Sequence, residues 1–582
     1  MYPNNFYTFK VRLKDKPFKT LDGNEYIQTA SISFFNEYGQ EIAYCELGYI
    51  AIDEIYKKIY NHEALCLDYV YVENFSILDY KNKYQINDEE SVEIFNFSAK
   101  SAVFYANNAT IFNGIIFKEK PVTFENALFI KGITSFDNVM FEEGNVNFNS
   151  AIFFNGNVSF YNTNFLKGTI NFKNTTWGIG NKNFQYTYWG NGDILFSNSL
   201  FKDGNISFVN CSFGDGELSF KVCSFGKGNI DFRFAVFGDG NLNFERTELG
   251  DGLIDFSKTE FGKAKVNFNK AIIGKAELNF DEIQMIEGKW LFKQVYMEEG
   301  SIHFDEAELK KAQIFFNRSI FKQVNISFYK SSLSVLSFEA CQLNSYCDLR
   351  LLHCNFLNLS GAFIRDIVDI SLEENPKSID SLYVFGTRLM GRIFLSWKNN
   401  GVQEMIHKST ENKYEKAWQY NLLKQNFNTI GQYDDEDLAY VAFKREELAL
   451  KKEQIQFEKW YKRLTKQFLL SFQNLVFDKM GLYATSPLRV FYSIIILWFF
   501  FGLLFSFLHY VGVGKTWSSV GNPDHISIFA QSFYHSAITF FTIGYGDVFP
   551  QGLSRILSSI EGFVGVFMMS YFTVAFVRKV LR

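Results

Sequence analysis

The chain has 582 residues, a net charge of -5, 68 phenylalanines and 7 cysteines. This length exceeds one ordinary domain, and the mixed charges exclude a nucleic-acid partner bound through a basic surface. The scattered cysteines form no CxxC pair, so a disulfide framework is not expected, and the N-terminus lacks the apolar core of a secretory signal.

Residues 1–105 precede any repeat, and we assign them to an N-terminal cap region. A strict twelve-residue repeat follows: from Phe112 through Phe328 every twelfth residue is phenylalanine, with a second large apolar residue five positions later. Apolar side chains two apart share one face of a strand, and Gly-x-Gly turns separate the pairs. The pattern predicts a β-solenoid over residues 106–345, whose stacked coils bury ladders of phenylalanine.

The step from a small residue to a large apolar one, as in Cys211-Ser-Phe213, resembles the pentapeptide-repeat proteins. That resemblance implies a right-handed, four-sided β-solenoid with coils of about 24 residues. The spacing departs from the family by alternating five and seven residues, and a flat coil of about 12 residues remains an alternative because successive repeats look alike. Outward charges alternate in sign, as at Asp215 and Lys227, so we expect a scaffold or ligand platform and no DNA mimicry.

The repeat stops after Phe328, and we assign residues 346–400 to the solenoid end and an irregular region. Residues 401–485 are dense in helix formers and predict a helical linker. Gly431 and the acidic residues after it predict a break into two helices, with Asp435 or Asp437 as the second N-cap.

The end of the linker places large apolar residues on one helical stripe with basic residues beside it. The stripe comprises Phe457, Trp460, Tyr461, Leu464, Phe468 and Phe472, and the basic residues are Lys459, Lys462, Arg463 and Lys466. This pattern predicts an interfacial helix on an anionic cytoplasmic leaflet. A buried cytosolic helix is the alternative.

Two apolar segments, 490–511 and 556–577, are long enough to cross a bilayer. Basic residues precede the first and follow the second, so we expect a multi-pass protein of the cell membrane with both termini cytoplasmic. Glu561 is the one acid within the second segment. We expect it to bond pore-helix hydroxyls or His535, and a charge facing the cavity is the alternative.

Between these segments, "IFAQSFYHSAITFF" is apolar enough to re-enter the bilayer as a short helix, and Thr542-Ile543-Gly544-Tyr545-Gly546-Asp547 follows it. Rings of backbone carbonyls can replace the hydration shell of K⁺, and Gly544 and Gly546 permit the backbone conformations that this requires. Residues 486–582 closely resemble the pore-loop potassium channels, whose signature is Thr-Val/Ile-Gly-Tyr-Gly-Asp between two membrane helices. Pro550 also matches, whereas Phe541 stands where a second threonine is common.

The resemblance implies K⁺ sites formed by the carbonyls of Thr542, Ile543, Gly544 and Tyr545 with the Thr542 hydroxyl. It also implies that the Tyr545 ring and Asp547 brace the filter from behind. Gly565 lies near the family's hinge position, with Gly562 as a second candidate, and a packing glycine is the alternative. A functional pore implies a homotetramer, because one chain supplies a quarter of each carbonyl ring.

The sequence contains no catalytic triad, metal-ligand set or phosphate loop, so we expect neither an enzyme nor a cofactor beside the permeant K⁺. We interpret Cys341, Cys347 and Cys354 near His353 as core thiols. A membrane-anchored tetrameric binding scaffold is the alternative function.

The sequence has no Arg-rich voltage sensor, and it ends five residues after Val577. We therefore expect gating from the N-terminal side, by a cytosolic ligand or protein on the solenoid acting through residues 401–480 on Arg489 and the first span. A solenoid that only aids assembly or docking is the alternative.

Overall fold

The computed structural model describes the chain except residues 1, 4, 21–22, 372–377, 457–458, 520, 522–525 and 582. Phe457, part of the expected apolar stripe, therefore lies outside the described residues. The chain divides into two compact units, Met1–Ser409 and Thr410–Arg582. We describe each unit by itself.

The N-terminal region is built directly onto the first coils of the solenoid. Strand β1 (Thr8–Lys14) pairs antiparallel with β4 (Gln28–Phe35), which pairs antiparallel with β5 (Glu41–Tyr49). Strand β5 then pairs in parallel with β6 (Val70–Glu73), and the short helices α1 (Ile52–Tyr60) and α2 (Ile77–Tyr84) lie among the first coils. These strands and helices cover the open end of the coil stack, where exposed strand edges would otherwise remain.

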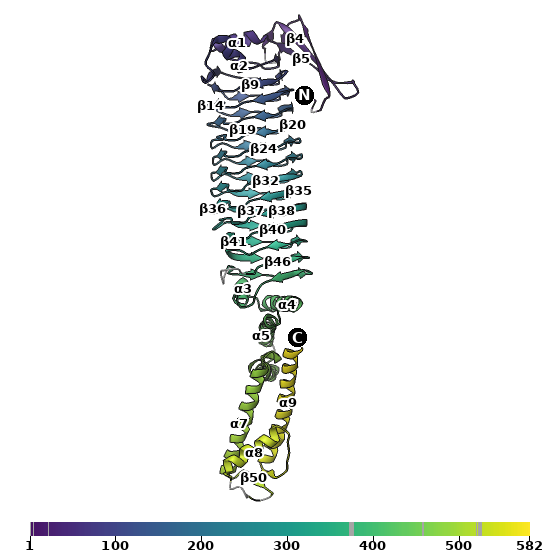
Figure 1. The fold of residues 1–582 in the computed structure, drawn as a ribbon, viewed down its shortest axis with the longest axis vertical. Coiled ribbons are helices and arrows are strands. Elements are labelled where there is room, and N and C mark those ends of the chain that lie inside the picture. Colours follow the sequence, from purple (N-terminus) through teal and green to yellow (C-terminus); the bar gives the residue numbers. More distant parts are fainter. Residues whose placement is uncertain are drawn as a thin grey trace. The chain divides into compact units, whose positions relative to one another are not determined.

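The solenoid has about 14 turns over residues 48–394, seen as the stacked strands of Figure 1. Its register is 24 residues, since Phe201 pairs with Phe225 and Ile206 with Ile230. One coil holds four short strands in separate parallel ladders, as in β25 (Ser212–Phe213), β26 (Leu218–Ser219), β27 (Ser224–Phe225) and β28 (Ile230–Asp231). The register therefore selects the 24-residue coil over the 12-residue alternative.

The twelve-residue phenylalanines form two stacked ladders inside the coils. Phe232 stacks on Phe208 and on Phe256, with ring centroids 4.6 and 4.5 Å apart. The intervening Phe220 and Phe244 stack in the second ladder, at 4.9 Å. All five are buried, and a fully buried phenylalanine contributes about 1.5–3 kcal/mol.

The corners of the coils explain the glycine turns. Gly204, Gly228 and Gly252 have φ of 131°, 143° and 148°, and a Cβ on Gly228 would lie 2.4 Å from the carbonyl oxygen of Gly204 one coil earlier. Only glycine tolerates both this backbone conformation and this approach.

The solenoid continues past the point where the sequence repeat stops. Gln313 pairs with Val335, Ile326 with Cys347 and Val368 with Ile393, so the coils change to 22, 21 and 25 residues. The coils end with β49 (Arg392–Phe394), followed by α3 (Val402–Ser409). The expected solenoid bounds of 106 and 345 are therefore too narrow, because the outer coils vary in length and lose the twelve-residue spacing.

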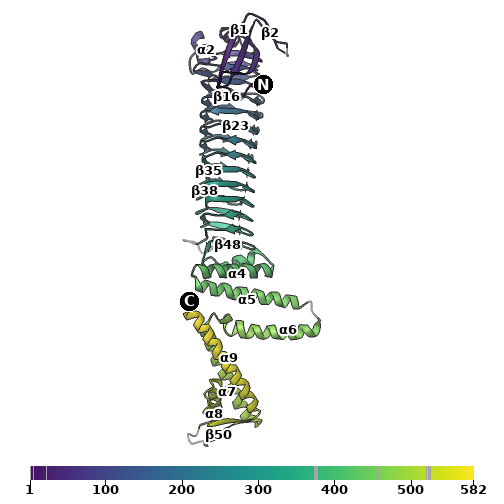
Figure 2. The ribbon, with the colours of Figure 1, turned by 90° about the vertical axis from the view of Figure 1, so that its right-hand side faces the viewer.

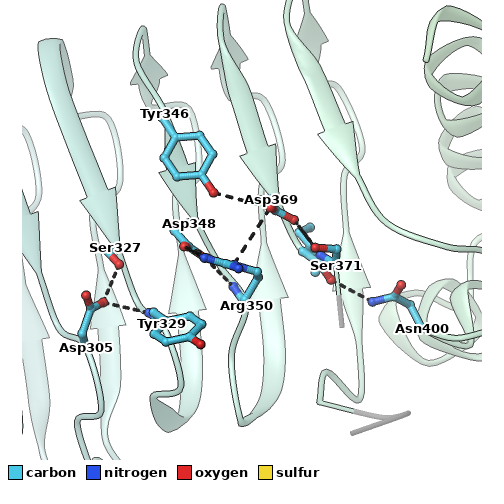
Figure 3. Close-up of polar contacts among 10 residues, drawn as sticks. Asp305, Ser327, Tyr329, Tyr346, Asp348, Arg350, Asp369, Ser371 and Asn400 are labelled. Carbon is cyan, nitrogen blue, oxygen red and sulfur yellow. Dashed lines mark hydrogen bonds and ion pairs between the residues drawn. The ribbon is translucent and has the colours of Figure 1, made fainter. Parts of the chain in front are cut away.

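Polar side chains on the outer face of these last coils link one coil to the next (Figure 3). Asp305 accepts hydrogen bonds from Ser327 and from the Tyr329 amide. The Arg350 guanidinium donates to Asp348 and lies 4.7 Å above the Tyr329 ring. The contacts of Asp305 with Ser327 and of Arg350 with the Tyr329 ring each join residues of successive coils, and they add to the stacking of Phe304 on Phe328.

The second unit begins with α4 (Lys413–Thr429) and α5 (Tyr433–Ile455), which pack side by side (Figure 2). The break at Gly431 is as predicted, and its φ is 78°. The predicted N-cap was wrong: Gln432 occupies that position, and Asp437 lies one turn inside the helix. The linker continues through α6 (Trp460–Gln473), the π-helical turn η1 (Asn474–Lys479) and the 3₁₀ turn η2 (Leu482–Ala484).

Candidate functional site

Two long apolar helices, α7 (Pro487–Val511) and α9 (Ser554–Val580), frame the candidate site. Their most apolar windows have mean hydropathies of 2.3 and 1.7, sufficient for membrane spans. Between them lie α8 (Ile528–Phe540) and a hairpin of β50 (Gly514–Ser518) and β51 (Val548–Gly552). The short helix predicted between the two apolar segments is present as α8, and the loop of residues 541–547 runs from its end to the start of β51.

The sign of the backbone angle φ alternates along this loop. Thr542, Gly544 and Gly546 have φ of 56°, 63° and 78°, whereas Ile543 and Tyr545 between them do not have positive φ. The amides of Ile543 and Gly544 donate to the Ile538 carbonyl at the end of α8, at 2.9 and 3.2 Å. When φ alternates in sign from one residue to the next, successive peptide groups turn toward the same side of the chain. This backbone can therefore present a row of carbonyl oxygens to a cation.

Asp547 is hydrogen-bonded within the chain, whereas Tyr545 and Ile543 of the same loop are exposed. Tyr534 of α8 donates to the Asp547 carboxylate at 2.9 Å, and the Ser519 amide donates to the Asp547 carbonyl at 2.8 Å. The Tyr545 ring is 71% exposed within one chain, and Ile543 is also exposed. Asp547 is thus held by residues of its own chain, whereas the Tyr545 side chain is exposed in the single chain.

Glu561 lies fully buried on α9 and faces α8. The Ser536 hydroxyl donates to its carboxylate at 2.5 Å, and His535 instead bonds the Ser558 hydroxyl at 2.8 Å. Of the partners expected from the sequence, the structure selects the pore-helix hydroxyl. Glu561 therefore joins the helix before the loop to the second span.

The two glycines of α9 differ in their surroundings. A Cβ on Gly565 would lie 2.0 Å from the Phe540 carbonyl oxygen at the end of α8, whereas a Cβ on Gly562 would meet no atom of the described residues within 4 Å. Gly565 is therefore a position of close helix contact.

Residues 493–582 match the family model described as an ion channel. The C-terminal part of the chain is an ion-channel domain. With its two apolar helices, this domain places the protein in a membrane, and the family description indicates ion transport. No curated protein and no solved structure matches the chain.

The end of the channel domain's second span is held by the linker. Arg578 donates to Asp437 of α5 at 2.8 Å and lies 4.7 Å above the Tyr440 ring. Lys579 pairs with Asp434 at 2.6 Å and with Asp437 at 3.3 Å. We call this set the α5–α9 clamp. Sequence reasoning missed it, although the acidic run after Gly431 and the basic end of the chain were both visible.

Outside the channel domain, the solenoid carries a polar groove of about 550 Å³. Its walls include Asn157, Asn181, Asn205 and Asn229, one on each of four successive coils. Each side-chain oxygen accepts from a backbone amide one coil later, at 2.9–3.1 Å. These bonds form a ladder of Asn side chains along the wall of the groove.

The sequence cluster of cysteines near His353 behaves as core thiols in the described part of the chain. Cys341, Cys347 and Cys354 are buried, and His353 bonds Asn355 at 2.7 Å. Burial raises the pKa of Cys341 and of Cys354 to about 12. No group of three potential ligands within the described residues could hold a metal ion.

Proposed function

We propose that the protein is a K⁺-selective channel that assembles as a homotetramer, with both termini in the cytoplasm. The observation that carries the proposal is the Thr-Ile-Gly-Tyr-Gly-Asp loop, with its alternating backbone, between two apolar helices of an ion-channel domain. The carbonyls of Thr542, Ile543, Gly544 and Tyr545 would take the place of water around K⁺. Four chains are required to complete each ring of carbonyls.

The exposure of the loop supports assembly. Ile543 and Tyr545 would be poorly placed in water, and the outer faces of α7 and α9 are apolar and exposed. Lipid can cover part of this surface, while neighbouring subunits would cover the part beside the loop.

We place the control of the gate on the second span. The sequence pointed to Arg489 and the first span, but the α5–α9 clamp joins the linker directly to the end of α9. A ligand or protein partner on the solenoid would act through the linker on this clamp, provided that it binds the open and closed states unequally. The Asn-lined groove is the candidate ligand site on the solenoid.

Purified protein in planar bilayers tests the conduction proposal. We expect single-channel currents whose reversal potential follows the K⁺ gradient and ignores the Na⁺ gradient. Gly544→Ala or Gly546→Ala should abolish this selectivity, because a Cβ disfavours the left-handed backbone that these positions require.

Gly562→Ala is the matched control, since its Cβ enters open space in the chain and should leave K⁺ selectivity unchanged. Equal permeability to Na⁺ and K⁺ in the wild-type protein would contradict the proposal. Membrane insertion and tetramer formation without single-channel currents would support the binding scaffold instead.

A further inference from the structure

Helix α6 exposes a continuous apolar stripe. Trp460 is 74% exposed and Phe468 is 72% exposed, so the described part of the chain leaves their rings largely uncovered. At about 100° per residue, the exposed stripe falls within an arc of about 120°, and it comprises Trp460, Tyr461, Leu464, Phe468 and Phe472. This exposure argues against the buried cytosolic helix, since such a helix would hide these side chains.

Helix α6 contacts α5 through one buried residue on the side away from the stripe. Leu470 is the buried residue of α6 and packs in one cluster with Leu448 and Ile455 of α5. Leu470 lies across the helix from the stripe, so the stripe faces away from α5. Figure 2 shows α5 and α6 running side by side, both crosswise to α9.

Contacts of the segment after α6 fix this helix at one end of the spans. Asp478 pairs with Arg445 of α5 at 2.9 Å. The Tyr571 hydroxyl of α9 donates to the Phe477 carbonyl at 3.2 Å and accepts from the Ala484 amide at 3.0 Å. Helix α6 is therefore held near the end of α9 that carries Arg578, the level at which an amphipathic helix would lie in the plane of the bilayer surface.

The charges of α6 match such a surface. Lys462 and Arg463 lie on either side of the stripe, and both are exposed. Long basic side chains at these positions can extend their charged ends to phosphate groups while the apolar side chains enter the lipid. Lys459 and Lys466 add positive charge to the same helix.

We propose that α6 binds the cytoplasmic leaflet, with its apolar stripe at the boundary of headgroups and acyl chains and with Lys462 and Arg463 on anionic phospholipid headgroups. The bilayer then holds α6, and α6 supports α5, whose first turns form the clamp on α9. This proposal assumes that the channel domain lies in a membrane, and it does not depend on K⁺ conduction.

The depth of α6 in the bilayer is the first test. Full-length protein carrying Phe468→Cys is labelled with bimane and placed in phosphatidylcholine nanodiscs with brominated acyl chains. Gln473→Cys, on the opposite face of the helix, is the matched control. The wild-type protein, whose cysteines are buried or half-buried, measures background labelling.

We expect fluorescence quenching at position 468 to exceed that at position 473 by at least about twofold, as for an inserted apolar face. Equal quenching at the two positions would overturn the proposal. Disulfide formation between chains at position 468, with little quenching, would also overturn it and would show that a neighbouring subunit covers the stripe.

The lipid charge is the second test. Nanodiscs of phosphatidylcholine alone are compared with an equal mixture of phosphatidylcholine and phosphatidylglycerol. We expect greater quenching at position 468 in the anionic mixture, lost in Lys462→Gln/Arg463→Gln and kept in the solenoid control Lys263→Gln. The same quenching in both lipids would overturn the anionic headgroup contact. Because neither test measures ion flow, failure of the conduction proposal would leave both results interpretable.

Discussion

At the scale of single residues, Lys182 departs from the pattern of the solenoid core. It occupies a ladder position between Val158 and Ile206, where the other coils carry mainly aliphatic side chains. The residue is 1% exposed, and its ammonium donates to the carbonyls of Lys202 and Asp203 at 3.0 and 3.4 Å. Burial lowers the pKa of Lys182 to about 8.

This pKa predicts a pH-dependent stability of the solenoid. Because the folded pKa lies below that of an unfolded lysine, the unfolded chain binds more protons between about pH 8 and pH 10.4, and stability from this residue rises with pH in that window. In the wild-type protein we expect Lys182 to raise the free energy of unfolding by about 2 kcal/mol between pH 7.5 and pH 9.5. Lys182→Met should lack that contribution.

Urea unfolding of the full chain, followed by tryptophan fluorescence, measures the difference, since Trp177 and Trp189 are buried nearby in sequence. Lys263→Met, at an exposed position, is the control and should follow the wild-type curve. Parallel pH profiles for wild type and Lys182→Met would contradict the prediction.

At the scale of elements, the solenoid depends on ladders whose members are one coil apart. Phe256 is fully buried and stacks on Phe232 at 4.5 Å and on Phe280 at 5.3 Å. Truncating a large aromatic core residue to alanine typically costs about 3–5 kcal/mol. Because each coil contacts mainly its neighbours, the loss should remain local.

We therefore expect Phe256→Ala to increase hydrogen exchange in the coils around residue 256 and to leave the coils around Phe136 unchanged. Phe234→Ala is the matched control, because Phe234 lies at a corner of the same solenoid with 49% of its surface exposed. Unchanged protection around residue 256 would show that this ladder does not stabilise its coil, whereas uniform loss along the solenoid would show that the coils unfold together.

At the scale of the whole molecule, the two units suggest separate tests of sensing and of the clamp. A protein that begins at Thr410 lacks the solenoid and keeps Asp434 and Asp437. A protein that begins at Lys451 also lacks these clamp residues. Both proteins are compared with the full chain in bilayers. The comparison distinguishes the effect of a ligand or partner bound to the solenoid from the effect of the α5–α9 clamp on the gate.

We expect the protein from Thr410 to keep the basal open probability of the full chain and to lose any response to cytosolic extract. The protein from Lys451 should show an altered open probability at unchanged K⁺ selectivity, and Asp437→Asn in the full chain should shift it in the same direction. Identical gating in all four proteins would contradict control through the linker.

Local sequence patterns were sufficient to predict the features that depend on neighbouring positions. The twelve-residue spacing of phenylalanine predicted the solenoid, the uninterrupted apolar segments predicted α7 and α9, and the hexapeptide from Thr542 to Asp547 indicated the channel domain. Gly431 marked the break between α4 and α5. In each case side-chain spacing or backbone freedom acts over a few residues, so a local pattern is sufficient.

Features that depend on contacts between distant residues became visible only in the folded chain. The 24-residue register required the pairing of whole coils, and coils of 21 to 25 residues extend the solenoid where the local repeat has ended. The clamp joins Asp437 to Arg578, 141 residues apart, and Asp437 lies inside α5 instead of at the predicted N-cap position. Glu561 had several plausible partners until packing placed it beside Ser536. The sequence does not indicate which partner a charged or hydroxyl group will bond, because only the packed backbone brings one of many candidates within bonding distance.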